Sequence, residues 1–390
     1  MDRDALIATA ERLLALVKTK STDMAPAVME HPTSIYVDPD RFERERQVLF
    51  RQTPLLAGLA CEIPDPGDWM THDDSGVPVL ITRNRQGELR AFLNVCRHRG
   101  ARLAAGPCGK ARGGRMSCPY HAWTYDLDGR LVGIPYGEGF DGVDKATRGL
   151  VPLPVAERHG MIFVLADPDG TIDLDAHLGP LDGELAFWGL DKLTPLGTKT
   201  LHTDANWKLT LDTYTEGYHF STLHPETIAT TAYTNIMTYD RFGRHHRLGF
   251  PSKTITQLEG QPKEAWQPLQ HFNFVYYLFP NTSFFVTDKT VEIFRICPGE
   301  AVNRSVTHHA FYAIPPLNSD AERQAMEETF AFIHHVVEHE DYVVTAGIQR
   351  GIDSGRTSSF LFGRNEPSLI TMHRQYVEAV DDPAQRAAAE

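Results

Sequence analysis

The first residues of the chain follow a helical pattern. Between residues 3 and 18, apolar side chains recur three or four positions apart, which is the spacing that lines one face of an α-helix. These side chains are Leu6, Ile7, Ala10, Leu13, Leu14 and Val17. We expect an amphipathic helix that docks onto the rest of the protein. A second helix is predicted to begin at Asp40, where Asp-Arg-Phe-Glu offers an N-cap, and to run to Phe50.

The stretch after this helix alternates between short apolar runs and turns. The predicted strands are residues 78–82, 89–95, 122–126 and 161–166. The first two are joined by Asn84-Arg-Gln-Gly87, a hairpin turn signal. Beyond residue 165 the pattern is broken by Asp167-Pro-Asp-Gly170 and by the Gly- and Pro-containing run 178–183. This indicates a small, β-rich domain that ends near residue 165.

The remaining chain mixes longer strands with helices. Its predicted strands are residues 272–279, 283–287, 291–297 and 306–314, which alternate as in an antiparallel sheet. A long helix is expected to begin near Asn318, where Asn-Ser-Asp-Ala-Glu resembles a capping sequence. We therefore predict an α+β protein made of a helical segment at 1–38, a β-rich domain at 39–165 and a larger domain at 166–390.

Composition narrows the class of partners. The 390 residues carry a formal net charge of −13, which argues against binding to nucleic acid or to an anionic membrane surface. No run approaches the ~18 apolar residues that span a bilayer, and the acidic N-terminus is unlike a signal peptide. We expect a cytoplasmic protein. Five cysteines then suggest ligands or thiols rather than a disulfide framework.

Two short segments each pair one cysteine with one histidine. They read Cys96-Arg-His98 and Cys118-Pro-Tyr-His121. A structural zinc finger usually pairs Cys with Cys and His with His, although a zinc site remains an alternative. Mixed pairs are typical of a Rieske [2Fe–2S] centre, in which two Cys hold one iron and two His hold the other. These four residues are our predicted cluster ligands.

A second candidate site lies in the segment 206–225. Glu216, His219 and His224 fall within nine residues, and Pro225 predicts that a helix bends or ends there. On a helix Glu216 and His219 would share a face, and the bend would let both imidazoles converge. Two His and one carboxylate are typical of open-sited iron(II) centres. The alternative is a pair of buried, hydrogen-bonded core histidines.

A carboxylate interrupts an apolar stripe of the expected C-terminal helix. The stripe consists of Met326, Phe330, Ile333, Val337, Val344 and Ile348. Asp341 falls in its middle, where a carboxylate is costly unless it is paired or bound to metal. The alternative for Asp341 is a salt bridge to Arg350 or to another helix. Glu338 and Glu340 are expected to be ordinary solvated acids.

Both motifs resemble those of the Rieske non-heme iron oxygenases, in their large (α) subunit. Cys-Arg-His-Arg-Gly and Cys-Pro-Tyr-His-Ala-Trp are similar to the cluster signature of that family. The iron motif is carried by Asn206, Trp207, Lys208, Glu216, Tyr218, His219 and His224, and a C-terminal motif by Glu340, Asp341, Gln349, Arg350 and Gly351. The resemblance extends from about residue 35 to residue 352.

The resemblance implies a Rieske [2Fe–2S] domain followed by a helix-grip (START-like) catalytic domain with an antiparallel sheet. It implies that His219, His224 and Asp341 hold iron(II), and that Glu216 bridges to a cluster histidine of a neighbouring subunit or holds His219. Asn206, Tyr214 and Tyr218 are expected to line the metal pocket.

The same resemblance implies partners. They are O₂ and a small-molecule substrate, a separate reductase that draws on NAD(P)H, with or without a ferredoxin, and further copies of the chain in a head-to-tail homotrimer, with or without a β subunit. Cys61, Cys108 and Cys297 have no place in either motif and are interpreted as structural.

The expected reaction is O₂-dependent hydroxylation of a small organic compound. The run 271–279, with Phe284 and Phe285, offers aromatic walls that suit an aromatic substrate, our first expectation. They also suit a quaternary ammonium group. Glu216, where many ring dioxygenases carry Asp, resembles the branch that oxidises N-methyl quaternary amines.

Two further questions stay open at this point. The basic cluster of Arg241, Arg244, His245, His246 and Arg247 either binds a substrate carboxylate or forms a solvated loop. An alternative of another class is a non-catalytic redox or ligand-binding protein.

Overall fold

The computed structural model describes residues 1–381, which form two compact units. The small unit comprises Arg46–His177 and Gly189–Lys192. The large unit comprises Met1–Glu45, Leu178–Trp188 and the described residues from Leu193 onward. The N-terminal segment is thus part of the large unit rather than a separate region, and the division lies later than residue 165. Residues 382–390 of the expected C-terminal domain lie outside the described part.

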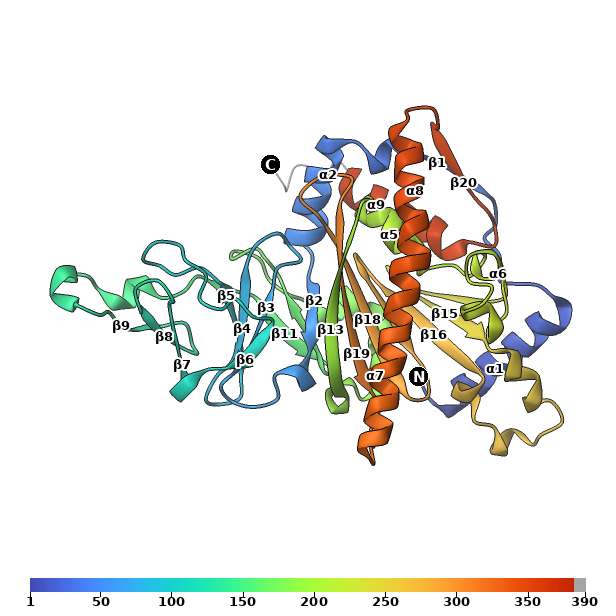
Figure 1. Ribbon diagram of the computed structural model, residues 1–390, viewed down its shortest axis with the longest axis horizontal. Coiled ribbons are helices and arrows are strands. Elements are labelled where there is room, and N and C mark those ends of the chain that lie inside the picture. The colour runs from blue at the N-terminus through green and yellow to red at the C-terminus, as the bar shows by residue number, and fades with distance from the viewer. Residues whose placement is uncertain (382–390) are drawn as a thin grey trace. The chain divides into compact units, whose positions relative to one another are not determined.

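The large unit is built on a seven-stranded antiparallel sheet (Figure 1). In order across the sheet the strands are β13 (Thr194–Thr203), β19 (Ser305–Ala313), β18 (Thr290–Pro298), β17 (Thr282–Val286), β16 (Phe272–Leu278), β15 (His245–Pro251) and β14 (Thr238–Phe242). The four strands expected from the sequence are the central ones, β16 to β19. The edge strand β13 and the pair β14–β15 were not predicted, because β13 is mostly polar and β15 is buried on both faces and lacks alternation.

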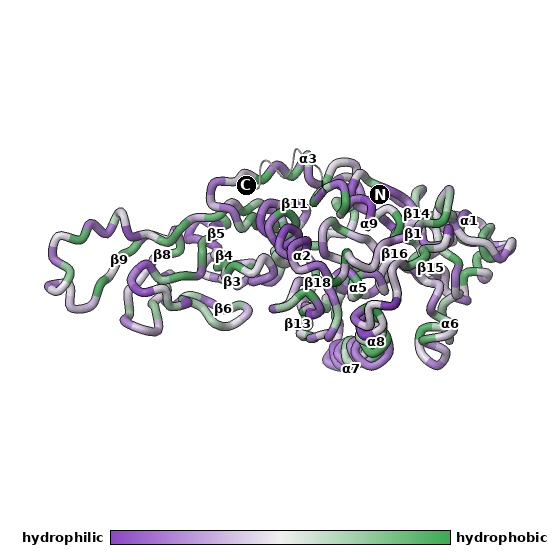
Figure 2. The backbone as a smooth tube through the Cα atoms, turned by 90° about the horizontal axis from the view of Figure 1, so that it is seen from above, coloured by the Kyte–Doolittle hydropathy of each residue, from purple (hydrophilic) through white to green (hydrophobic). Residues whose placement is uncertain are grey.

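One long helical rod crosses a face of this sheet (Figure 1). It consists of α7 (Asp320–Val336), a π-helical turn (Val337–Asp341) and α8 (Tyr342–Asp353). The hydroxyl of Ser319 accepts a hydrogen bond from the Glu322 N–H and caps its start. A long helix on an antiparallel sheet confirms the α+β expectation. In Figure 2, α7 is largely hydrophilic, whereas hydrophobic stretches occur in α8.

The π-helical turn changes which residues of α8 are buried. One extra residue in the turn moves the apolar stripe forward by one position. The buried residues of α8 are accordingly Tyr342, Thr345, Gln349 and Ile352. Val344 and Ile348, expected in the stripe, are instead 44% and 41% exposed. A stripe drawn with uniform helical spacing is therefore wrong beyond residue 341.

The remaining helices of the large unit surround the sheet. They are α1 (Arg3–Thr19), α2 (Pro39–Glu45), α4 (Asp182–Leu185), α5 (Trp207–Asp212), α6 (Phe220–Leu223) and α9 (Pro367–Asp381). The N-terminal helix is confirmed, with Leu6, Ala10 and Leu13 buried. The second helix begins as expected and continues as a π-helical turn at Arg46–Arg51. A two-stranded sheet pairs β1 (Met29–Pro32) with β20 (Ser359–Phe362).

The small unit consists of three antiparallel sheets. The largest is made of β10 (Pro152–Leu153), β5 (Leu89–Leu93), β4 (Val79–Arg83), β3 (Asp68–His72) and β6 (Cys108–Lys110). A second contains β11 (Val155–Arg158), β12 (Met161–Val164) and β2 (Leu55–Leu59), and a third β7 (Arg115–Ser117), β8 (Thr124–Asp126) and β9 (Leu131–Gly133). The predicted hairpin is the β4–β5 pair. The short helix α3 (Leu174–Leu178) follows where the chain leaves this unit.

In residues 1–381 no helix has both the length and the apolar character needed to cross a membrane.

Candidate metal centres and the adjoining cavity

The two cysteine–histidine loops of the small unit share one backbone fold. In the first loop, the Cys96 N–H donates to the Ala101 carbonyl and the Gly100 N–H to the Cys96 carbonyl. In the second, the Cys118 N–H donates to the Trp123 carbonyl and the Ala122 N–H to the Cys118 carbonyl. Each turn is closed by a residue with positive φ, Gly100 at 76° and Ala122 at 56°. The two cysteines therefore occupy equivalent positions in their loops, whereas His98 lies two residues and His121 three residues after its cysteine.

The four predicted cluster ligands come together between these loops. Cys96 and Cys118 are buried and lie within hydrogen-bonding reach of each other. The His98 and His121 rings are half-buried, and their centroids are 4.7 Å apart. Trp123 stacks on His98 with centroids 4.9 Å apart. Two thiols on one side and two imidazoles on the other are the donor set of a Rieske cluster.

One atom of this set supports the fit of a cluster. His121 Nδ1 is buried and has no hydrogen-bond partner among the described residues. A buried polar atom of this kind costs free energy unless something binds it. Desolvation, and then the neighbouring His98 and Arg99, lower the pKa of His121. A neutral ring nitrogen is the form that binds iron.

The segment that carries the second motif is not a continuous helix. Helix α5 begins after Asn206 and ends at Asp212, and a loop precedes the short helix α6. His219 and His224 are the residues that flank α6 at its two ends. Gly217 lies in the loop, where a Cβ atom would be only 2.7 Å from Phe250 Cε1. Glu216 and His219 thus meet through a tight loop rather than along a helix face.

His219, His224 and Asp341 converge on one point. Their ligand atoms all lie within 4.8 Å of one another. His219 Nε2 is 3.6 Å and His224 Nε2 is 3.3 Å from Asp341 Oδ1. Asp341, at the last position of the π-helical turn, is only 7% exposed. Two imidazole nitrogens facing one buried carboxylate suit a divalent metal such as iron(II).

Two further acids hold the far nitrogens of these histidines. Glu216 pairs with His219 Nδ1. Glu340 Oε2 lies 2.5 Å from His224 Nδ1 and also accepts a hydrogen bond from the Thr227 hydroxyl at 2.9 Å. Each pairing leaves Nε2 for a metal and fixes the tautomer of the ring.

Glu340 was expected to be a solvated acid, and that expectation is wrong. The π-helical turn brings it toward His224. The signals that could have indicated its role were its position beside Asp341 and its place in the C-terminal family motif. The burial of His224 lowers its pKa, but hydrogen bonds and charges from Asp341 and Glu340 outweigh this and raise it overall. The hydroxyl of Thr213 donates to Asp341 Oδ1 at 2.7 Å and thereby orients the carboxylate of Asp341.

The three residues expected to line the pocket have different places. Tyr214 lines the cavity beside the triad, and its hydroxyl lies 2.7 Å from that of Tyr342. Asn206 does not line it: its side chain caps α5 and donates to the carbonyls of Tyr36 and Val302. Tyr218 is 61% exposed and lines neither cavity described here. The expectations for Asn206 and Tyr218 are therefore wrong. Asparagine at the start of a helix favours capping, as Asn206 does for α5. Tyr218 lies in the loop before α6.

A cavity of about 220 Å³ adjoins the triad within the large unit. Its aromatic walls are Tyr214, Phe220, Phe250, Phe285 and Phe294. Phe285 comes from the aromatic run noted in the sequence, whereas Phe284 is buried in the core on the other face of β17. A second cavity, of about 370 Å³, touches the triad from the Glu216 side and is also lined by Asp212 and Glu366.

The basic cluster lies away from this cavity. Arg247 is buried and pairs with Glu184 at 2.6 Å and Asp240 at 2.9 Å. His245 and His246 are buried in β15. None of the five residues lines either cavity. Arg247 is therefore part of a structural ion-pair network and not a ligand for a substrate carboxylate in the cavity. Arg241 and Arg244 are exposed beside the turn at Gly243, so the interpretation as a solvated loop holds for these two residues alone.

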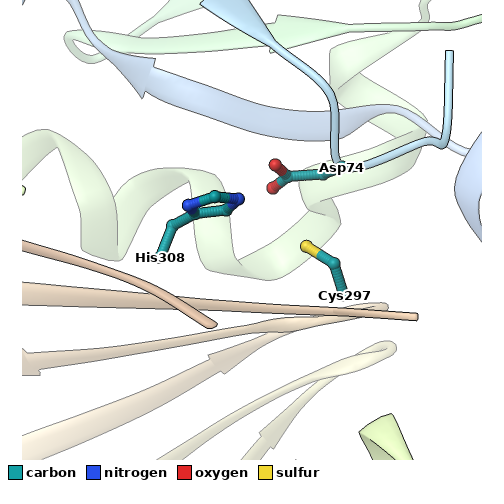
Figure 3. Close-up of side chains that lie close together, drawn as sticks. All are labelled: Asp74, Cys297 and His308. Carbon is teal, nitrogen blue, oxygen red and sulfur yellow. The ribbon is translucent and has the colours of Figure 1, made fainter. Parts of the chain in front are cut away.

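The remaining cysteines are also placed away from the predicted ligands. Figure 3 shows Cys297 and His308 on one side of β18 and β19. Because alternate residues of a strand face opposite sides, this is the face away from Phe294, which lines the cavity. Cys61 is half-buried and Cys108 is exposed in β6.

Comparison with known proteins places the two units in described families. The family profile "Ring hydroxylating alpha subunit (catalytic domain)" matches residues 190–382, and that of the "Rieske [2Fe-2S] domain" matches residues 54–145.

Named relatives come from two kinds of oxygenase. The chain is 39% identical over 198 residues to the glycine betaine monooxygenase oxygenase subunit of Chromohalobacter salexigens, a match that covers 50% of this chain and 43% of the relative. It is 35% identical over 202 residues to the anthranilate 1,2-dioxygenase large subunit of Acinetobacter baylyi, covering 50% and 42%. The matches thus span about half the length of this chain and less than half of each relative.

The fold is similar to that of a solved structure. The quaternary ammonium Rieske monooxygenase CntA, in complex with an inhibitor, superimposes with a TM-score of 0.77 at 22% sequence identity. The superposition covers 91% of this chain and 99% of that one. At this level of identity the likeness concerns the fold alone.

Proposed function

Because the chain belongs to the Rieske non-heme iron oxygenases, as an α subunit, we propose that it is the terminal component of an oxygenase that demethylates a small quaternary ammonium compound. The observation that carries this proposal is the aromatic cavity beside the histidine–aspartate triad. Phe285, Phe294 and Tyr214 line this cavity, and aromatic rings of this kind attract a methylated cation through cation–π contacts. The likeness to a glycine betaine monooxygenase subunit supports the same substrate class.

The residues proposed to hold the two cofactors are those described above. Cys96, His98, Cys118 and His121 would hold the [2Fe–2S] cluster, and His219, His224 and Asp341 the iron(II). When bound, the cluster supplies electrons one at a time and the iron supplies a site for O₂ reduction. Glu216 and Glu340 keep the Nδ1 protons of the two histidines in place, and the aromatic walls exclude water from the substrate.

The overall reaction follows from the chemistry of the substrate. One methyl group of the ammonium compound takes up one oxygen atom of O₂, while two electrons and two protons reduce the other atom to water. The hydroxymethyl ammonium product then breaks its C–N bond, which releases formaldehyde, a proton and the tertiary amine. The electrons would come from NAD(P)H through a separate reductase, because the sequence carries no nicotinamide-binding fingerprint.

A second candidate is oxygenation of an aromatic acid. It is favoured by the 35% identity to an anthranilate dioxygenase subunit. However, an aromatic acid brings a carboxylate, and no lysine or arginine among residues 1–381 lines the cavity. We therefore place it second.

A substrate panel tests the proposal. Protein loaded with iron and cluster, supplied with a surrogate reductase and NADH, would receive methylated ammonium compounds, benzoates and phenols in turn. We expect O₂ uptake to match formaldehyde release for at least one ammonium compound. Oxygenated products from benzoates or phenols, with no formaldehyde from any ammonium compound, would exclude demethylation as the function.

We also propose that the protein assembles as a homotrimer in which Glu216 faces a neighbouring subunit. The apolar side chains of Val344, Ile348 and Leu361 are exposed in the single chain. The same three residues line the second cavity beside Glu216. Burying such a surface favours association. Sedimentation of the full chain as a monomer would contradict this proposal.

A further inference from the structure

Glu292 is a buried carboxylate that the triad does not use. It lies in β18, opposite Phe285 of β17 and Phe311 of β19, and lines the cavity with Phe294. Only 5% of the surface of Glu292 is exposed to solvent. A carboxylate surrounded by aromatic rings is costly unless other groups stabilise it.

A histidine holds this carboxylate from the neighbouring strand. His309 Nε2 lies 3.1 Å from Glu292 Oε2, and the His309 ring stacks on Phe294 with centroids 3.9 Å apart. The other ring nitrogen of His309 lies 3.4 Å from Nδ1 of His334 in α7. Burial is the main cause that lowers the pKa of His334 to about 4, so this second ring is neutral at pH 7. The arrangement orients Glu292 within the cavity wall.

The cavity offers this carboxylate no cationic side chain. Among the residues the structure describes, its acidic lining residues are Glu216, Glu292 and Asp341, and it contains no lysine or arginine; the two triad histidines also line it. Glu216 and Asp341 face the triad histidines, whereas Glu292 lies on the sheet. A substrate carboxylate would therefore enter a wall of aromatic rings and acids with no lysine or arginine to pair with.

We propose that Glu292, held by His309, is a specificity-determining residue that selects an ammonium substrate carrying no carboxylate. This inference rests on the proposed function. It assigns the substrate to simple cations, such as hydroxyalkyl or alkyl trimethylammonium compounds, rather than to zwitterionic betaines. The aromatic rings bind the methyl groups, and Glu292 supplies the opposite charge.

Three small probes of similar shape separate charge from size. Choline is a trimethylammonium cation, glycine betaine bears a carboxylate instead of the hydroxymethyl group, and 3,3-dimethylbutan-1-ol replaces the nitrogen of choline with carbon. Binding of each probe to the holoenzyme would be measured by titration calorimetry. We expect choline to bind at least about tenfold more tightly than either of the other probes.

Substitution at Glu292 tests the residue itself. In Glu292→Gln we expect the preference for choline over the neutral alcohol to fall by about tenfold. The control is Glu259→Gln, which removes an exposed carboxylate and should leave all three affinities unchanged. Far-UV circular dichroism and thermal unfolding check that each variant is folded, and the wild-type comparison of the three probes does not depend on any variant.

The outcomes distinguish this inference from the proposed function. Equal or tighter binding of glycine betaine to the wild-type protein, binding of no probe, or an unchanged preference in Glu292→Gln, overturns the role of Glu292. Demethylation of a betaine with tight binding would leave the proposed function standing while this inference fails. Selective binding of choline with no formaldehyde from any ammonium compound would support the role of Glu292 and contradict the proposed function.

Discussion

The two candidate metal sites of this protein are built in different ways. In the small unit, four ligands come from two loops of nearly identical backbone, each closed by the same pair of hydrogen bonds. In the large unit, two histidines flank a four-residue helix, and the carboxylate comes from a helix far along the chain. The first site is local in sequence, whereas the second exists only after long-range packing.

This difference shows where each site is sensitive to change. The loops of the small unit are held mainly by their own turns, so single hydrogen bonds to the ligands adjust the electronic properties of the site. The triad depends on carboxylates brought from the π-helical turn, so a change there removes the site itself. We expect substitutions to have larger effects at the triad than at the loops.

The largest effect is expected for Asp341→Asn. The amide is a poorer metal ligand than the carboxylate, and it cannot balance the charge of a divalent ion. Product formation should fall by at least about 100-fold, with loss of the mononuclear iron. The visible spectrum of the cluster, which serves as the internal control, should not change. Retained product formation would contradict the role of Asp341 as a metal ligand, and a changed cluster spectrum would mean that the two sites are not independent.

A smaller loss is expected for Glu340→Gln. Without the carboxylate, His224 keeps its ring but loses the partner that fixes its tautomer. We expect the affinity for iron(II), measured by competition with a chelator, to fall about 10- to 100-fold. The matched control is Glu338→Gln, an exposed acid in the same turn. Equal iron affinities in the two variants would contradict the role assigned to Glu340.

The smallest effect is expected at the cluster, for Tyr125→Phe. The Tyr125 hydroxyl lies 3.4 Å from Cys96 Sγ and accepts a hydrogen bond from the Arg97 N–H at 3.0 Å. Losing one hydrogen bond to sulfur should lower the one-electron reduction potential by roughly 20–60 mV, without loss of iron. Tyr136→Phe, which changes a tyrosine of the same unit that is 84% exposed, is the control for redox titration. A shift of equal size in both variants would show that the hydroxyl of Tyr125 has no special role.

Local features of this protein could be predicted well. The amphipathic N-terminal helix, the β4–β5 hairpin and the central strands β16 to β19 follow from side-chain spacing and turn residues. The four predicted cluster ligands could also be grouped from the sequence, because each pair lies within one turn, and the structure brings the two pairs together. The spacing of Asp341 within an apolar stripe indicated a buried carboxylate, which the structure bears out.

Other features required the fold. Uniform helical spacing could not reveal the π-helical turn, which changes the buried face of α8 and brings Glu340 to His224. Asn206 matched a family motif, yet its amide caps α5 instead of entering the cavity. Glu292 and His309 gave no signal, because each looks like an ordinary polar residue in a strand.

The amino-acid sequence by itself determined the short-range turns and periodicities, since these depend on the backbone preferences and polarity of neighbouring residues. Only the tertiary structure decided which distant carboxylates face the histidines and that Glu292 lines the cavity from the sheet. Those positions depend on how strands pair in register and on one extra residue in a helical turn, and neither is recorded in local spacing.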